Sequence, residues 1–145
     1  YTFYMHGFNV RSTDLQAFLG LKQMEKAKWV AQRRYENHLR YARNLEGYVQ
    51  YQNWRGHKPV SISFGALANS TEHRQEIINR LVEKKVETRI FSAGNLGRHP
   101  FWVERYGRFD DEMSNKIHEQ GFFVPNYPEL TNDDIDFICK VIKGE

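Results

Sequence analysis

Apolar and polar residues alternate most regularly at residues 60–66, where Val, Ile, Phe and Ala are separated by Ser, Ser and Gly. This period of two predicts a β-strand with one buried face. Shorter apolar segments predict further strands at residues 48–52, 86–91 and 121–124, and Pro125 ends the last of them. These predicted strands all lie after Gly47, and the chain itself opens with a strand-like apolar segment.

Helical periodicity fills much of the remaining chain. Ser12 or Thr13 can cap a helix in which apolar residues recur at spacings of three and four, and helical character continues to Gly47. We expect one long helix or two helices with a bend. Residues 69–85, 101–106 and 112–120 predict further helices, the last two of them short.

The last predicted helix has a clear start signal. Thr131 and Asp134 have the spacing of a capping box. The apolar face that follows comprises Ile135, Ile138, Cys139 and Ile142. The lone Cys139 therefore reads as a buried, inert thiol.

From Gly47 the predicted order is strand, strand, helix, strand, short helices, strand, helix. This order predicts an α+β fold with a small, mostly antiparallel sheet covered by helices on one face, and with the long N-terminal helices packed beside it. A chain of 145 residues fits one domain, and apolar residues at 40% supply a core.

Membrane spans, secretory leaders and the first residue of the chain bear on where the protein is located and on whether the chain is a fragment. No apolar run approaches the roughly 20 residues of a membrane span, and no secretory leader precedes the first strand-like segment, so we expect a cytoplasmic location. The chain starts at Tyr1, which suggests a cut or processed chain; a trimmed tag on a complete small protein is the alternative.

Metal and covalent chemistry lack their usual patterns. The six histidines never fall at the spacing of a zinc pair, and no nucleophile elbow, P-loop or dinucleotide fingerprint occurs.

Seven Lys or Arg lie from Lys22 to Arg43, interleaved with aromatic residues, which raises nucleic-acid binding as an alternative. Because these charges spread around the helix, a solvated face explains them better.

The segment from His6 to Arg11 is a candidate anion site. In an extended chain Asn9 and Arg11 project to the same side, close to the free N–H groups of the helix that begins near Thr13. An amide, a guanidinium and a helix N-terminus suit a phosphate. Alternatively, Asn9 caps a turn and Arg11 pairs with Asp14.

Residues 92–100 carry Gly and Pro too often for regular structure and predict a polar loop. The loop holds Asn95, Arg98 and His99, and such converging polar groups often recognise a substrate. An ordinary turn with exposed charges is the alternative. Asn126, between two prolines, gives the same signal more weakly.

Six short motifs follow one another in order along the chain. They are Gly7-Phe8-Asn9-Val10-Arg11, Gly20-Leu21-Lys22-Gln23-Met24, Glu87-Thr88-Arg89, Ala93-Gly94-Asn95-Leu96, His99-Pro100 and Gly121-Phe122-Phe123-Val124-Pro125-Asn126. Together they resemble the DegT/StrS family of pyridoxal-phosphate-dependent enzymes that aminate or deoxygenate nucleotide-linked keto sugars. The four motifs from Glu87 onward are similar to the branch of sugar 3-dehydratases and perosamine-type aminotransferases.

The resemblance implies an arm from a large domain at residues 1–11, connecting helices at 12–46 and the C-terminal small domain of a fold-type I enzyme at 47–145. It implies that Asn9 and Arg11 contact pyridoxal phosphate across a homodimer, and that Asn95, Arg98 and Asn126 contact a nucleotide sugar.

The family's Asp and its Schiff-base Lys, or the His that replaces that Lys, lie before the start of this chain. We therefore expect a C-terminal fragment that is inactive alone. A non-catalytic partner module of a split enzyme is the alternative.

Overall fold

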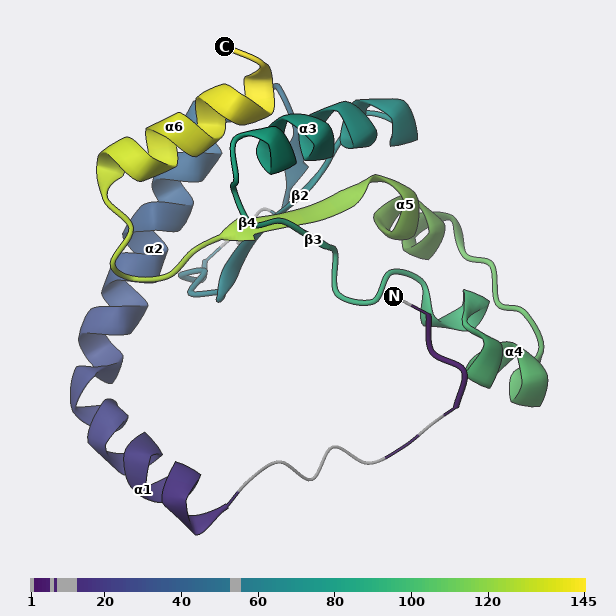
Figure 1. Ribbon diagram of the computed structural model, residues 1–145, viewed down its shortest axis with the longest axis horizontal. Coiled ribbons are helices and arrows are strands. Elements are labelled where there is room, and N and C mark those ends of the chain that lie inside the picture. The colour runs from purple at the N-terminus through teal and green to yellow at the C-terminus, as the bar shows by residue number, and fades with distance from the viewer. Residues whose placement is uncertain (1, 6, 8–12, 53–55) are drawn as a thin grey trace.

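A four-stranded sheet in the order β1-β2-β4-β3 forms the centre of the computed structural model, which describes residues 2–5, 7, 13–52 and 56–145 (Figure 1). The strands are β1 (Gln50–Tyr51), β2 (Ser63–Leu67), β3 (Arg89–Ile90) and β4 (Gly121–Pro125). All three strand pairs are antiparallel. The sequence-based prediction of a small antiparallel sheet is confirmed.

One face of this sheet forms the core. Alternation along β2 and β4 places Phe64, Ala66, Phe122 and Val124 on the same side, each at most 2% exposed. Helices α2 (Ala27–Asn44), α3 (Thr71–Glu83) and α6 (Asn132–Lys143) cover this side (Figure 1). The ring of Tyr41 stacks on Phe64 with centroids 4.8 Å apart. Each such buried side chain contributes about 1.5–3 kcal/mol.

Strand β2 is shorter than the alternating pattern predicts. Its ladder ends at Ser63, which pairs with Pro125, and Val60 and Ile62 are exposed. Proline has no backbone N–H, so Pro125 cannot donate to the ladder. The partner strand therefore decides where β2 begins.

Helix α6 agrees with its sequence signal. Thr131 and Asp134 form the capping box, and the four predicted inward residues are buried. Burial raises the pKa of the Cys139 thiol to about 11, which keeps it protonated and unreactive.

The N-terminal helices behave differently from each other. Helix α1 (Asp14–Gln23) begins at a capping box formed by Thr13 and Gln16, and a 3-10 turn, η1 (Met24–Lys26), joins it to α2. The predicted bend is thus present. Helix α2 buries its C-terminal half, but α1 buries no residue and extends away from the sheet (Figure 1). The expected packing beside the sheet therefore holds for α2 alone.

Three short elements connect β3 to β4. They are the 3-10 turn η2 (Leu96–Arg98), helix α4 (Pro100–Tyr106) and helix α5 (Glu112–Gln120). Residues 92–100 were expected to lack regular structure, but η2 lies within them and Pro100 starts α4. Proline suits that position because the first helical N–H has no partner within the helix. Helix α5 then leads directly into β4.

Candidate functional site

The second face of the sheet, opposite the core, is lined by aromatic rings. Phe123 of β4 lies 4.5 Å from the ring of Phe91, measured between centroids. Both rings pack over Gly65, where an added Cβ would lie 2.5 Å from Phe91 Cε2. Glycine at this position therefore lets the two rings approach the backbone of β2 closely.

Two adjoining cavities of about 250 and 450 Å³ open over this face. We call them together the sheet groove. Both cavities are lined by Ile62, Ser63, Arg89 and Phe123. The smaller one extends to Glu87, Thr88, Asn126 and Tyr127, and the larger one to Phe3, Ser61, Ile90 and Ser92.

The chemistry of the sheet groove is mixed. Aromatic carbon from Phe123 adjoins serine hydroxyls, and Arg89 Nη2 lies 2.8 Å from Glu87 Oε1 in an ion pair at the rim. Apolar walls with a few placed polar groups are typical of small-molecule sites. Rings, hydroxyls and a guanidinium can contact the ring faces, hydroxyls and phosphates of a polar ligand.

Asn126 is the buried polar side chain of this groove. Its Nδ2 donates to the backbone oxygens of Ser61 at 2.9 Å and Arg34 at 3.3 Å. Its Oδ1 is buried and accepts no hydrogen bond from the part of the chain that the structure describes. A buried acceptor without a donor costs about 1–3 kcal/mol, so this atom is suited to receive a donor from a ligand.

A stripe of side chains on α2 fixes the backbone around Asn126. Asn37 Nδ2 donates to Tyr127 O at 3.0 Å, and Tyr41 Oη donates to Pro125 O at 2.9 Å. Arg33 donates to two further carbonyls of the same segment, 2.9 Å and 3.3 Å away. The Oδ1 of Asn37 is also buried without a partner in the described chain, but Asn37 lines neither cavity.

Asn95 forms hydrogen bonds within the chain through its amide nitrogen, its amide oxygen and its backbone N–H. Its Nδ2 donates to Asn115 Oδ1 at 2.8 Å and to Phe109 O at 3.1 Å, while its Oδ1 accepts from Gly97 N at 2.8 Å. Its backbone N–H donates to His118 Nδ1 at 3.1 Å. Asn95 therefore holds residues 92–100 in shape, and it lies outside the sheet groove.

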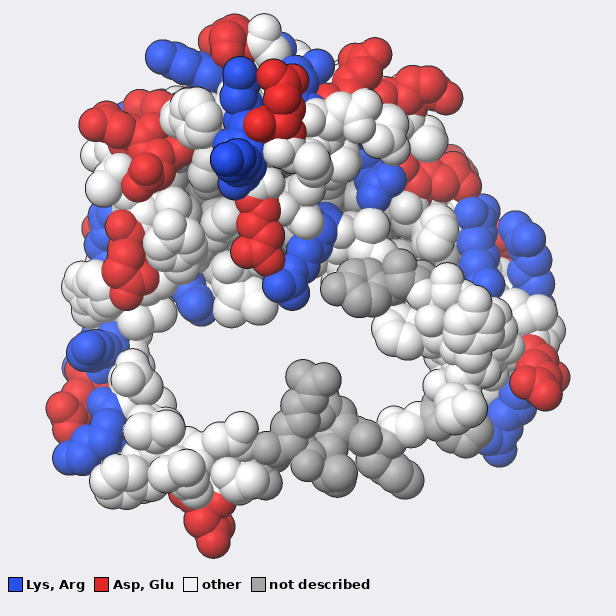
Figure 2. Space-filling view, in the orientation of Figure 1, with Lys and Arg blue, Asp and Glu red and all other residues white. Residues whose placement is uncertain are grey.

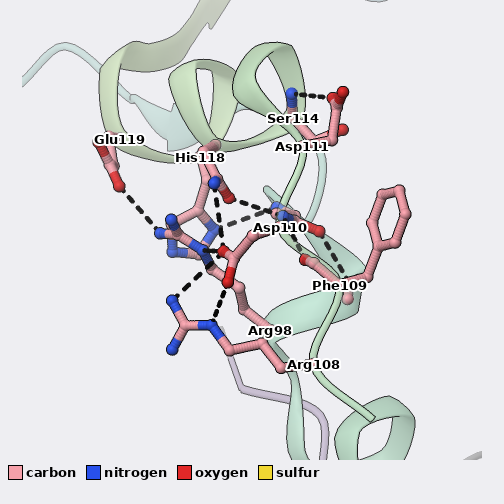
Figure 3. Close-up of polar contacts among 11 residues, drawn as sticks. Arg98, Arg108, Phe109, Asp110, Asp111, Ser114, His118 and Glu119 are labelled. Atoms are coloured by element: carbon pink, nitrogen blue, oxygen red, sulfur yellow. Dashed lines mark hydrogen bonds and ion pairs between the residues drawn. The ribbon is translucent and has the colours of Figure 1, made fainter. Parts of the chain in front are cut away.

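Arg98 is paired with two carboxylates (Figure 3). Its Nε lies 3.1 Å from Asp110 Oδ1 and its Nη1 lies 2.9 Å from Glu119 Oε1. Hydrogen bonds from Arg108, and then from Arg98, lower the pKa of Asp110 to about 2. Because two carboxylates pair with its guanidinium, Arg98 links the loop at residues 92–100 to α5 in this structure.

The structure does not bring the predicted site residues together. Asn126 lies in the sheet groove, whereas Asn95 and Arg98 belong to the supported loop at residues 92–100. Asn9 and Arg11 lie outside the described residues. Their roles toward cofactor and substrate stay predictions.

Sequence reasoning missed Phe3, Ser63 and Phe123 as groove residues. The period of two in β2 did place Ser63 opposite the core face, and the same alternation applied to β4 would have placed Phe123 beside it. No sequence signal brings Phe3 to this site, because it arrives from the far end of the chain.

Two further classes of site find no support in the described residues. Helices there are too short or too polar to cross a membrane. Across the same residues no three His, Cys, Asp or Glu side chains are grouped to hold a metal ion.

Comparisons with known proteins identify the family to which the chain belongs. The profile of the DegT/DnrJ/EryC1/StrS aminotransferase family matches residues 1–143. The chain is 28% identical to the lipopolysaccharide biosynthesis protein RfbH of Salmonella typhimurium, over 95% of this chain and 33% of that protein. It is 30% identical to a dTDP-4-dehydro-2,6-dideoxy-D-glucose 3-dehydratase of Saccharopolyspora spinosa, over 98% of this chain and 32% of that protein.

Solved structures show the same fold. A GDP-4-keto-6-deoxymannose-3-dehydratase with a trapped PLP-glutamate geminal diamine matches 97% of this chain with a TM-score of 0.79 at 19% identity. The Helicobacter pylori aminotransferase PseC matches 95% with a TM-score of 0.80 at 17% identity. The chain covers 38% of each of these two structures, and about a third of the curated relatives above. It belongs to the DegT/DnrJ/EryC1/StrS aminotransferase family.

Proposed function

We propose that this chain is the C-terminal part of a pyridoxal-phosphate-dependent enzyme that aminates or 3-dehydrates a nucleotide-linked keto-deoxy sugar, and that its sheet groove contributes to substrate binding. Family membership and the sugar substrates named for its relatives support this proposal. We propose that the whole protein is cytoplasmic and forms a homodimer.

The observation that carries the proposal is the buried Oδ1 of Asn126 beside a cavity walled by Phe123. Sugars present hydroxyl donors at their edges and C–H groups on their faces. A hydroxyl can donate to Asn126 Oδ1 while a sugar or base face packs on Phe123. The hydroxyl of Thr88 already donates to Phe123 O at 2.9 Å, which fixes the strand edge beneath the ligand.

The residues of the sheet groove do not fit covalent attachment of the cofactor. No lysine lines either cavity in the described chain, and covalent attachment of pyridoxal phosphate needs a desolvated lysine with a partner on the pyridine nitrogen. The work that we propose for the sheet groove is to bind and orient the sugar, and to exclude water from one side of it.

Binding of nucleotide sugars tests the proposal. GDP-mannose, dTDP-glucose and UDP-glucose serve as probes, with saturation-transfer NMR to detect contact and calorimetry to give the dissociation constant. We expect at least one probe to bind. Asn126→Ala should weaken that binding by about five- to tenfold through the lost acceptor, and Phe123→Leu should weaken it while retaining an apolar side chain.

Asn79→Ala is the matched control. Asn79 is an exposed residue of α3, the helix that covers the opposite face of the sheet, so its removal should leave binding unchanged. Thermal melts establish that each variant is folded. Absence of binding by every probe, or equal affinity of the wild type and both groove variants, contradicts the proposal.

A further inference from the structure

The N-terminal segment, residues 2–5, lies beside the loop at residues 92–100 and contacts it through Phe3 (Figure 1). Phe3 N donates to His99 Nδ1 at 3.0 Å, and Phe101 N donates to Phe3 O at 3.2 Å, so both backbone groups of Phe3 are paired. The Phe3 ring lies 5.0 Å from the His99 ring and edge-on to Phe101 at 6.3 Å, measured between centroids. Hydrogen bonds and ring packing thus act on the same residue.

His99 is oriented to accept that hydrogen bond. The side chain is 3% exposed, and its Nε2 lies 2.9 Å from the backbone oxygen of Ala93. A carbonyl oxygen only accepts, so Nε2 carries the hydrogen and Nδ1 presents a lone pair. Ala93 therefore selects the tautomer that can receive Phe3 N–H.

Phe3 is also part of the sheet groove. It lines the larger cavity together with Ser63, Ser92 and Phe123, although it lies 96 positions from His99 in the sequence. The strands supply the floor of the cavity, and Phe3 adds a side wall from another part of the chain. This wall exists only while the segment stays docked on His99.

We propose that His99 is a positioning residue for the sheet groove: by accepting the Phe3 amide, it fixes Phe3 as a wall of the cavity in which the ligand lies. The identity of that ligand rests on the proposed function, whereas the docking of Phe3 does not. His99 reaches the ligand through Phe3.

Amide hydrogen exchange followed by NMR tests the docking without any ligand. His99→Leu removes the acceptor but keeps an apolar side chain, and it should accelerate exchange at Phe3 and Phe101 by about tenfold. His99→Gln offers both an acceptor and a donor and should restore most of the protection. Phe3→Pro removes the donor without touching the loop, and it should accelerate exchange at Phe101 as His99→Leu does.

His73→Leu is the matched control. His73 Nδ1 accepts a backbone N–H from Asn69 at 3.2 Å, so the substitution removes a similar hydrogen bond at the start of α3. Exchange at Phe3 and Phe101 should stay at the wild-type rate. Unchanged exchange in both His99→Leu and Phe3→Pro, or equal acceleration in His73→Leu, overturns the proposal.

A double-mutant cycle measures the effect on the ligand, with the nucleotide sugar from the panel that binds best. His99→Leu and Phe3→Ala should each raise its dissociation constant about fivefold, and the double variant should be no weaker than Phe3→Ala. Additive losses overturn the positioning role. If no probe binds the wild type, the proposed function fails, and the exchange rates still decide whether His99 holds Phe3.

Discussion

Arg40 of α2 and Asp136 of α6 meet in a two-pronged ion pair, in which Arg40 Nε lies 2.7 Å from Oδ1 and Nη2 contacts Oδ2. Asn44 Nδ2 donates to the same Oδ1 at 2.7 Å. The contact joins two helices that both pack on the core face of the sheet. It also lowers the pKa of Asp136, first through the hydrogen bond from Arg40.

Removing this pair should destabilise the fold modestly. Both side chains are about a third exposed, so solvent weakens the interaction, and we expect Asp136→Ala to lower the free energy of unfolding by about 1 kcal/mol. Urea denaturation measures it. The exposed pair Lys22–Glu25, 3.8 Å apart, is the control, and Glu25→Ala should have no measurable effect. Equal losses in the two variants would argue against the bidentate geometry.

Stability should fall in mildly acidic solution because of two histidines. Burial lowers the pKa of His38, and burial followed by the charges of Arg98, His99 and Arg74 lowers the pKa of His118, against an opposing effect of Glu119. The unfolded chain then takes up protons first as the pH drops below about 6.5. The stability is fully present above that pH and is lost as the pH falls toward the lowered folded pKa values.

The slope is at most about 1.4 kcal/mol per pH unit for each histidine. Urea denaturation between pH 7.5 and pH 5, approximately the range of histidine titration, measures it. His118→Gln and His38→Gln should each flatten the curve, with the same change at the exposed His57 as the comparison. A curve that is flat across this range in the wild type contradicts the assignment.

Gly94 should tolerate no side chain. Its φ is +67°, and an added Cβ would overlap His118 Nδ1. We expect Gly94→Ala to cost about 2–4 kcal/mol, from backbone strain and from displacement of the ring that accepts Asn95 N–H. Gly144, at the end of α6, has φ +82° and ψ 30°, and an added Cβ there would meet only Arg80 side-chain atoms at 3.6 Å, so Gly144→Ala should cost only about 1 kcal/mol. Equal losses of unfolding free energy would remove the steric contribution of His118.

The chain alone should not attach pyridoxal phosphate covalently, because no lysine lines the sheet groove in the described residues. Mixing the two should give no stable visible absorption band beyond that of the urea-unfolded chain. A band that borohydride removes while labelling a single lysine would show that an anchoring lysine lies in this chain.

The sequence predicted local structure best where one segment supplies all the determinants. The capping box at Thr131 needs only Asp134, three residues away, and α6 follows as expected. Strand β3 was expected at residues 86–91, yet only Arg89 and Ile90 pair, because β3 lies at the sheet edge and meets β4 at two positions. Edge strands depend on their partners, which a local pattern does not contain.

The candidate site was less accessible to sequence reasoning for the same reason. Asn126 stood out between two prolines, but the carbonyl groups that accept its hydrogen bonds belong to Ser61 and Arg34, 65 and 92 positions away. Asn95 looked available for a ligand, whereas acceptors 14 and 20 positions later occupy its amide. Whether a polar side chain in a loop is available depends on such distant partners.

The two faces of the sheet place different packing demands on the side chains of β2 and β4. Phe64 and Phe122 must fit the helices around them, and a change of volume there costs stability throughout the domain. Ser63 and Phe123, on neighbouring residues of the same strands, face the groove and carry little of that packing. Substitutions at these positions can therefore change the shape and chemistry of the groove while the scaffold stays intact.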